Sequence, residues 1–418
     1  MSGCPLDCAA IAVARTDINV GNRRLMKPLD GIRVLDLSRM VAGGLTGMLL
    51  ADFGADVVKV EQPGTGDPLR NWTAGGMPLW WSVYGRGKRY VTLNIQSDEG
   101  KQILLRLLPR FDVLIESFVP DTMERYGLGW DILHQHNPRL VMVRISGWGR
   151  GGPGANRPGF GTLVEAGTGF AAMNGEGDRP PFLPSFPLAD MTSGLYATNA
   201  IMFALYHRDV HGGEGQQIDV SLFESLFSLL GPLPAEYASL GKVRTRQGNR
   251  STNAGPRGCY RTLDGQWIAV SGSTPKMAER FLEGYGLDHL LEDERFRSNE
   301  ARVRHAEELD AAIRDAIGVR TLSANLEIIT KNKLTAHPVQ TIAEIESDAH
   351  WQQRQLTLDV GLNGRSVRMH NVVPRLSATP GEIRWPGGDL GEHNEEIYCG
   401  ELNMTPANVD ALRSRGVI

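Results

Sequence analysis

Short apolar runs that alternate with helix-like runs are the feature that most limits how this 418-residue chain can fold. From about Lys27, the residues Ile32–Leu37 and Ala55–Glu61 have the composition of short buried strands, and the run 45–53 between them has that of a helix. A strand, a helix and a second strand at this spacing favour a parallel pair, because parallel neighbours need a crossover connection.

The alternation continues to Ile145. Strands are expected over 90–93, 113–116 and 140–145, with helices over 100–108 and 130–136. The pattern therefore predicts an α/β protein with a doubly wound, Rossmann-like parallel sheet.

The remainder of the chain suggests four parts. The glycine- and proline-rich stretch over 147–181 is expected to be loop. Pro232 and Pro234 follow an apolar helix, and a hairpin with its turn at Asp264–Gly265 comes after them. Charged helices over 276–330, a β-rich stretch over 356–373 and a helix over 406–414 complete the chain. We expect an N-terminal extension over 1–26, a large domain starting over 27–231, a linker and smaller α+β domain over 232–349, and a segment over 350–418 that returns to the large domain.

Charge and apolar content exclude several classes of protein. The 44 basic and 48 acidic residues give a net charge of -4, so no overall attraction to nucleic acid or to anionic membranes is expected. No apolar run approaches the roughly 18 residues of a membrane span. Cysteines at positions 4, 8, 259 and 399 form neither a disulfide framework nor a zinc motif, so we expect a cytoplasmic protein without a metal site.

Asp190 lies in the turn Pro187–Gly194, directly before a run of apolar residues at helical spacing that starts at Leu195. It is expected at or beside a helix N-cap, where free backbone N–H groups and the helix dipole would keep its carboxylate ionised. The local sequence leaves two interpretations open, an ordinary helix cap and a nucleophile.

A dinucleotide-binding enzyme is an alternative suggested by the first strand and helix. The interval from Gly43 to Glu61 matches the spacing between a glycine turn and the acidic residue that contacts ribose. The glycines in 42–47 do not form the pattern G-x-G-x-x-G, however, which argues against a nicotinamide or flavin enzyme. Glu61 is expected to be structural, or to contact something other than a ribose.

Several motifs occur in a fixed order along the chain. They are Leu29–Leu37, Leu50–Glu61, Gly64–Asp67, Gly85–Arg89, Asn137–Leu140, Leu390–His393 and Leu412–Ile418. Together they resemble the family III CoA-transferases, which include formyl-CoA and carnitine CoA-transferases and, as a divergent branch, the α-methylacyl-CoA racemases. The resemblance covers nearly all of the chain after residue 27.

The resemblance implies that Asp190 is a nucleophile that passes CoA from an acyl-CoA donor to a small carboxylic acid through an aspartyl-CoA thioester. Acyl-CoA is then a substrate, and no tightly bound cofactor is expected. The resemblance also implies an interlocked homodimer. Arg150 or Arg157 is expected to pair with a second carboxylate of the acid, which would favour dicarboxylic acids such as succinate.

The same resemblance implies a set of CoA contacts. They are Met40, Val41, Arg86, Lys88, Arg89, Leu93, Arg125, Arg150 and Arg157. Arginine suits the phosphates of CoA because its guanidinium binds two oxygens at once. Gln62 and Gln96 stand where some relatives carry a basic residue.

Two other functions remain as alternatives. A racemase needs a second acid–base group opposite the aspartate, and the corresponding stretch, Pro158–Thr162, has Phe160 where the racemases carry a His-Asp pair. A non-catalytic acyl-CoA-binding protein would share the fold, but loss of the aspartate would be its expected sign, and Asp190 is present.

Overall fold

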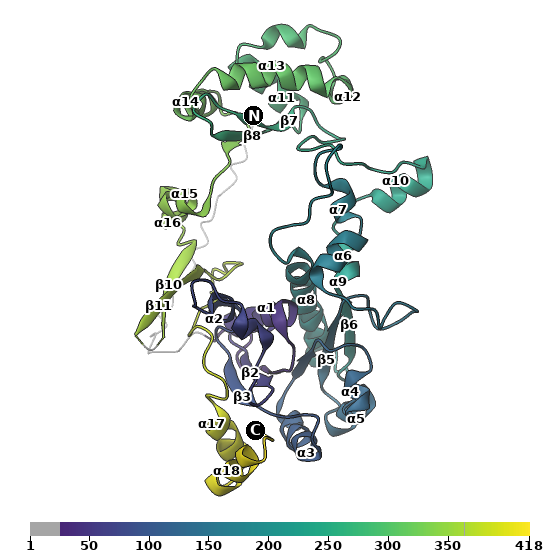
Figure 1. The fold of residues 1–418 in the computed structure, drawn as a ribbon, viewed down its shortest axis with the longest axis vertical. Coiled ribbons are helices and arrows are strands. Elements are labelled where there is room, and N and C mark those ends of the chain that lie inside the picture. Colours follow the sequence, from purple (N-terminus) through teal and green to yellow (C-terminus); the bar gives the residue numbers. More distant parts are fainter. Residues whose placement is uncertain (1–25, 363) are drawn as a thin grey trace, which may run out of the picture.

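A computed structural model of the protein describes residues 26–362 and 364–418. The predicted N-terminal extension lies outside the described residues, except for Met26. Figure 1 shows a sheet domain, a smaller domain at the opposite end of the molecule, and two separate runs of chain that join them.

Six parallel strands form the central sheet of the large domain. Their bounds are β1 Arg33–Asp36, β2 Asp56–Glu61, β3 Arg89–Thr92, β4 Val113–Glu116, β5 Val141–Ser146 and β6 Gln217–Ser221. They lie in the order β3-β2-β1-β4-β5-β6, and every neighbouring pair is parallel. The predicted doubly wound α/β sheet is therefore confirmed.

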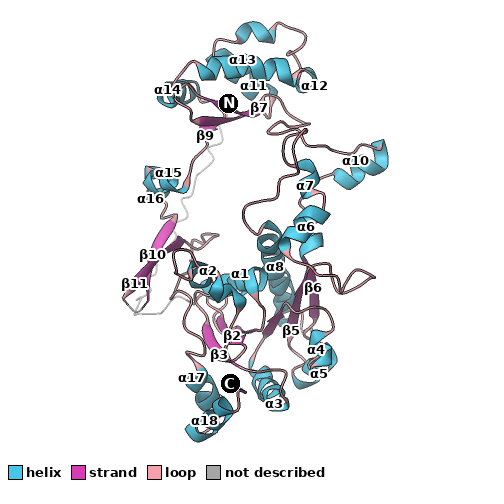
Figure 2. Cartoon of the chain, viewed as in Figure 1, coloured by secondary structure: helices cyan, strands magenta, loops and turns pink. Residues whose placement is uncertain are grey.

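Helices cover both faces of this sheet (Figure 2). Alternate strand residues such as Leu35 and Val58 belong to one apolar core, and their neighbours Val34 and Val57 belong to the other. The first core includes α3 Asp98–Leu107 and α5 Trp130–His136, and the second includes α1 Met40–Asp52 and α8 Leu188–Val210. Short elements complete the connections: η1 Pro68–Asn71, α2 Leu79–Tyr84, η2 Leu108–Arg110 and α4 Thr122–Arg125.

Helix α1 begins at Met40, five residues before the start predicted from the sequence. The prediction treated Gly43 and Gly44 as a turn, but both lie within the helix and are buried. A Cβ at Gly43 would lie 2.1 Å from the Ser38 side chain, and one at Gly47 would lie 2.8 Å from Asp36. The glycines therefore allow close packing of α1 against the strand ends, and tertiary packing outweighs their low helix propensity.

Two segments contain helices that the residue pattern does not predict. The stretch after β5, predicted as loop, includes α6 Gly161–Gly167 and α7 Phe170–Met173. The presumed linker after α9 Leu222–Phe227 contains α10 Leu233–Leu240. Pro232 and Pro234 lie at the beginning of α10, where a missing N–H costs no helical hydrogen bond.

The smaller domain has its own core. The predicted hairpin is present as β7 Arg257–Arg261 and β8 Trp267–Ser271, and β9 Ala336–Pro338 adds a third strand. The helical elements of this domain are α11 Pro275–Gly284, η3 Asp288–Leu291, α12 Asn299–Arg304, α13 Ala306–Gly318 and α14 Leu322–Asn332. Buried Phe281, Ile313 and Ile317 belong to this core.

The final segment returns to the sheet domain. It contains α15 Ile342–Ser347, α16 Ala349–Gln353, the hairpin β10 Thr357–Leu362 with β11 Arg365–His370, α17 Asn394–Gly400 and α18 Pro406–Ser414. Ile397, Tyr398 and Val409 are buried in the core beside β1 to β5. Within the described residues, no helix is long and apolar enough to cross a bilayer. We retain the four-part division of the chain as a proposal.

Candidate active site

Asp190 is the third residue of α8, so it lies in the first turn of the helix and not at its cap. The capping position is taken by Pro187, which has no side-chain hydrogen bond to offer. The buried residues Ala189, Ser193 and Gly194 hold this end of α8 in the protein. A Cβ at Gly194 would lie 2.8 Å from the carbonyl oxygen of Ala42, so the first turns of α8 and α1 pack closely.

The Asp190 carboxylate lies against the first turn of α6. A Cβ on Gly161, the first residue of α6, would lie 2.3 Å from Asp190 Oδ2. Real atoms do not approach so closely, so any side chain at position 161 would displace this carboxylate from its observed place. Gly161 is buried and its backbone is helical, so the glycine is required by space and not by backbone conformation.

A second carboxylate lies beside the first. Glu165, one turn further along α6, is only 3% exposed, and its Oε1 accepts a hydrogen bond of 3.1 Å from the backbone N–H of Ala189. The same oxygen would lie 3.8 Å from a Cβ on Gly161. Two carboxylates from two helices therefore meet at the beginning of α8.

Burial, followed by the charge of Glu165, raises the pKa of Asp190 to about 6. From the sequence, the helix N-terminus is expected to keep this carboxylate ionised, and the raised pKa shows that this expectation is wrong in its direction. A backbone hydrogen bond does lower the pKa, but burial and the neighbouring carboxylate have the larger effect. Asp190 is thus a partly desolvated carboxylate whose ionised form is destabilised.

The described residues supply no histidine partner for Asp190 of the kind that a racemase needs. Phe160 is 69% exposed and carries no acid–base group. His207 lies far along α8, roughly 25 Å from Asp190 at 1.5 Å per residue, and His211 follows the helix.

A pocket of about 100 Å³ opens at the carboxyl ends of β1, β2 and β3. This is the edge of a doubly wound sheet where ligands bind in proteins of this architecture. The pocket is lined by Leu37, Ser38, Arg39, Lys59, Val60, Glu61, Gln62, Gly66, Asp67, Leu93, Ile95, Gln96, Phe118 and Tyr126. Leu93 was a predicted CoA contact, whereas exposed Arg39, whose guanidinium lies 5.5 Å from the ring centre of Phe118, was not.

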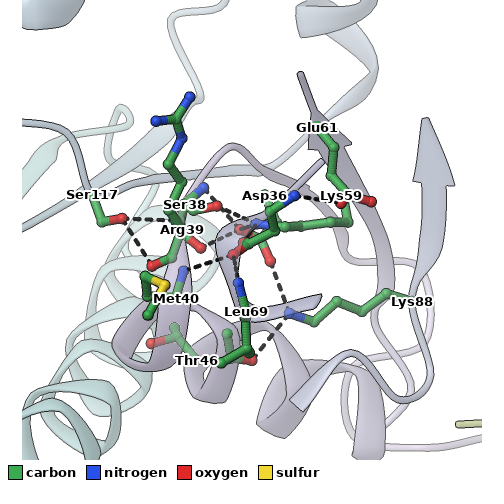
Figure 3. Close-up of polar contacts among 12 residues, drawn as sticks. Asp36, Ser38, Arg39, Met40, Thr46, Lys59, Glu61, Leu69, Lys88 and Ser117 are labelled. Carbon is green, nitrogen blue, oxygen red and sulfur yellow. Dashed lines mark hydrogen bonds and ion pairs between the residues drawn. The ribbon is translucent and has the colours of Figure 1, made fainter. Parts of the chain in front are cut away.

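The turn between β1 and α1 joins this pocket to the beginning of α8. Figure 3 shows the turn held from several sides. Met40 has a φ of 62°, which is uncommon for a residue other than glycine, and its backbone N–H donates to Asp67 Oδ1 at 3.1 Å. The next residue, Val41, belongs to a small apolar cluster against which Met191 packs. The predicted contacts Met40 and Val41 thus lie between the pocket and the residue after Asp190.

Buried charges beneath the turn fix its position. Lys59 Nζ lies 3.5 Å from Asp36 Oδ1 and 3.2 Å from Asp67 Oδ2, and it also donates to the Ser38 carbonyl oxygen. Burial alone would raise the pKa of Asp36, but Lys59, Lys88 and the Ser38 hydroxyl together hold it below its usual value. Burial likewise opposes the charge on Lys59, yet its carboxylate neighbours raise its pKa.

Three of the basic residues predicted to bind CoA are engaged with carboxylates of the chain. Arg86 is fully buried and donates to both oxygens of Asp52, at 3.1 and 2.6 Å. Lys88 is buried against Asp36 at 2.9 Å. Arg89 bonds Asp56 together with Glu396 and Glu401 on α17 and just after it. The structure does not bring these three side chains to the pocket, and their role in CoA binding stays a prediction.

The other three predicted cations differ in whether carboxylates of the chain already pair with them. Arg125 is exposed beside the pocket residue Tyr126, and its guanidinium donates to Thr122 Oγ1 at 2.7 Å. Arg150 lies 3.7 Å from Glu116 and 3.2 Å from Glu124. Arg157 is exposed in the loop before α6 and makes no ion pair among the residues that the structure describes.

Three residues of the site were missed by sequence reasoning: Gly161, Glu165 and Arg39. Gly161 and Glu165 fall in a stretch predicted as loop, so their one-turn spacing on α6 carried no signal. Glu61, by contrast, was expected to be structural, and it binds both Arg70 Nε at 2.7 Å and Arg70 Nη2 at 2.8 Å.

Comparison with known proteins identifies related chains. A family model described as CoA-transferase family III matches residues 29–394. The chain is 37% identical to a succinyl-CoA–D-citramalate CoA-transferase of Chloroflexus aurantiacus, over 96% of this chain and 100% of that protein. It is 39% identical to the beta subunit of a succinyl-CoA–L-malate CoA-transferase of the same organism, over 94% of this chain and 98% of that subunit. A crystal structure of a CAIB/BAIF family protein from Brucella suis matches with a TM-score of 0.79 and 30% identity, covering 90% of this chain and 99% of the other.

Proposed function

The chain belongs to CoA-transferase family III, and on that premise we propose that it transfers CoA from succinyl-CoA to a dicarboxylic acid, with Asp190 as the covalent carrier. The observation that supports Asp190 most strongly is its setting, a partly desolvated carboxylate in the first turn of α8 for which Gly161 leaves room. An ordinary helix cap would not need a glycine in a neighbouring helix to make space for its carboxylate.

In the proposed reaction, an oxygen of the ionised Asp190 attacks the thioester carbonyl of the donor. The carbon–sulfur bond breaks, CoA leaves as a thiolate, and an acyl-aspartyl anhydride remains. The thiolate then attacks the Asp190 carbonyl carbon, which releases the donor acid as a carboxylate and leaves an aspartyl-CoA thioester. The acceptor carboxylate repeats these steps in reverse, so no net proton is consumed. Covalent catalysis of this kind divides one exchange into easier steps.

For the nucleotide end of CoA, we propose the pocket at the carboxyl ends of β1 to β3. Its apolar wall includes Leu93 and Phe118, exposed Arg39 lines it, and exposed Arg125 precedes the lining residue Tyr126 in the chain, so the two arginines are the proposed partners of the phosphates. The turn at Met40 and Val41 continues from this pocket toward Asp190, which supports a path for the pantetheine arm along it.

The names of two relatives support dicarboxylic substrates, since succinate, D-citramalate and L-malate each carry two carboxylates. Arg157 is the better placed of the two arginines expected to bind the second carboxylate, because Arg150 is already held by Glu116 and Glu124. Arg157 is exposed and lies four residues before Gly161 in the chain.

For the assembly, we propose an interlocked homodimer. Two features support it. The ribbon describes an open loop between the sheet domain and the smaller domain (Figure 1), and α8 carries exposed apolar side chains along one side. These are Leu195, Met202, Phe203, Tyr206 and Val210. Because one relative is named as a subunit, a second, different chain is the other outcome of a test of assembly.

The function is tested by supplying succinyl-CoA with citramalate, malate or glutarate and separating the CoA esters formed. We expect a new CoA ester with at least one dicarboxylic acid and much less with acetate or propionate. Arg157→Gln is expected to raise the acceptor KM roughly tenfold, since it removes a charged hydrogen bond. Arg110→Gln, a change of an exposed arginine on η2, should leave the KM as it is. Transfer to monocarboxylic acids alone would contradict the proposed substrate class.

A further inference from the structure

We propose that Glu165 is a positioning residue for the nucleophile, and that its charge favours the acylated form of Asp190 over the free carboxylate. This inference rests on the proposed function of Asp190. It begins with the geometry of one helix end, where the Glu165 Oε1 accepts the N–H of Ala189 and the Asp190 Oδ2 lies against Gly161.

Glu165 takes the place of a missing helix cap. Pro187 offers no side-chain acceptor, and the N–H groups of a first helical turn have no partner within the helix. Glu165 reaches one of them from α6, so its carboxylate is anchored with only 3% exposure. The Asp190 carboxylate lies close to this anchored carboxylate, because a Cβ on Gly161 would lie 2.3 Å from Asp190 Oδ2 and 3.8 Å from Glu165 Oε1.

Repulsion between the two carboxylates ends when Asp190 is acylated. The free Asp190 is negatively charged, whereas its anhydride and its CoA thioester are neutral. At low dielectric, two like charges close together destabilise the state in which both are present. Glu165 therefore raises the free energy of the resting enzyme relative to both covalent intermediates. Protonation of Asp190 removes the same charge, so it relieves the same repulsion.

Other charged groups around α8 do not face Asp190 in this way. Helix α1 carries Asp52 only at its far end, where it bonds Arg86, and α7 has no ionisable side chain. The remaining ionisable neighbours are engaged elsewhere: Glu224 on α9 with Ser221, Arg144 on β5 with Glu116 and Glu124, Asp219 on β6 with the Arg150 backbone, and Arg208 and Asp209 with each other at the opposite end of α8. Glu165 is the charge that acts on Asp190.

The test uses Glu165→Gln, which keeps an oxygen to accept the Ala189 N–H but removes the charge. Two quantities are measured, the pH dependence of kcat/KM and the fraction of aspartyl-CoA adduct at equilibrium with succinyl-CoA and succinate. We expect the acidic limb of the pH profile to move down by about one pH unit. The adduct equilibrium constant should fall by about tenfold, because one pKa unit and a factor of ten in an equilibrium constant are the same free energy.

The agreement of these two shifts distinguishes an electrostatic role from a structural one, since a loss of packing would lower activity without moving the pH limb. Glu165→Asp retains the charge and should restore the wild-type limb. Glu224→Gln removes a nearby carboxylate that is tied to Ser221, and it should move neither quantity. Thermal melting of each variant identifies any that fails to fold.

A folded Glu165→Gln protein with an unshifted limb and normal adduct would overturn the role of Glu165 while leaving Asp190 as the carrier. No adduct in the wild-type protein with any tested donor would instead overturn the proposed carrier, and this inference with it.

Discussion

At the scale of single residues, the ionised carboxylate of Asp190 lowers the stability of the folded protein. Its pKa in the fold, about 6, lies above the ordinary value of 3.8, so the folded state binds a proton more tightly than the unfolded chain does. Stability is therefore lost as the pH rises from about 4 to 6. Above that range the ionised carboxylate destabilises the fold by a constant amount, which is the expected condition of a residue kept for chemistry and not for packing.

Asp190→Asn should for this reason stabilise the protein while abolishing transfer. We expect a gain of about 1–3 kcal/mol in the free energy of unfolding at pH 8, and a much smaller gain at pH 4, where the wild-type carboxylate is protonated in the folded state and about half protonated in the unfolded chain. Urea unfolding of both proteins at the two pH values measures this. A destabilised variant at pH 8 would show that the carboxylate is a structural cap.

Gly161→Ala tests the space around the same carboxylate. The added Cβ would meet Asp190 Oδ2 at 2.3 Å, so Asp190 has to move, and we expect kcat/KM to fall by about 100-fold. Gly151→Ala is the matched control, because a Cβ there meets nothing within 4 Å. Steady-state kinetics on both variants checks the prediction, which is wrong if Gly161→Ala retains wild-type activity.

Asp190 could be identified from the sequence only through the resemblance, because its local pattern also fits a helix cap. Its surroundings could not be predicted. Gly161 and Glu165 belong to α6, and the many glycines and prolines around this helix favour a loop. For two predicted CoA contacts the error was the reverse, because the sequence suggested a binding role where the structure shows internal ion pairs. Arg86 and Lys88 have the composition of a phosphate site, but the carboxylates that bind them, Asp52 and Asp36, are distant in sequence.

At the scale of elements, the turn between β1 and α1 is the part that links CoA binding to chemistry. It is held in an uncommon backbone conformation by buried ion pairs and not by a glycine. The first five strands could be predicted from the alternation of apolar runs, because that alternation depends only on residues close together in the sequence. The start of α1 could not, because its glycines are explained only by the side chains that pack against them.

Lys59→Met should destabilise the protein by about 3–5 kcal/mol, because it leaves Asp36 and Asp67 buried without their shared cation. Lys101→Met removes a surface ion pair with Asp98 and should cost no more than about 1 kcal/mol. Denaturant unfolding measures both. Similar small losses in the two variants would show that the buried cluster does not hold the turn.

At the scale of the whole molecule, the single chain leaves a row of apolar side chains on α8 exposed, among them Phe203, Tyr206 and Val210. Exposing contiguous apolar surface to water is unfavourable, and such a surface usually marks an interaction site. This supports assembly with a second copy, a feature that periodicity alone does not predict.

We expect a dimer that persists on dilution, because two interlocked chains cannot separate without unfolding. Phe203→Glu, at a side chain that is 74% exposed in the single chain, should prevent assembly of the dimer. Sedimentation at nanomolar and micromolar concentration gives the mass directly. A wild-type monomer at the lower concentration would contradict the interlocked arrangement.

The most direct test of Asp190 as the carrier is the intact mass of the protein after incubation with succinyl-CoA, followed by peptide mapping. The expected result is a mass increase equal to one CoA less one water, as a thioester requires, located on the peptide that contains Asp190 and absent from Asp190→Asn. An adduct of the same mass on another residue, or one that persists in Asp190→Asn, would contradict the assignment of Asp190 as the carrier.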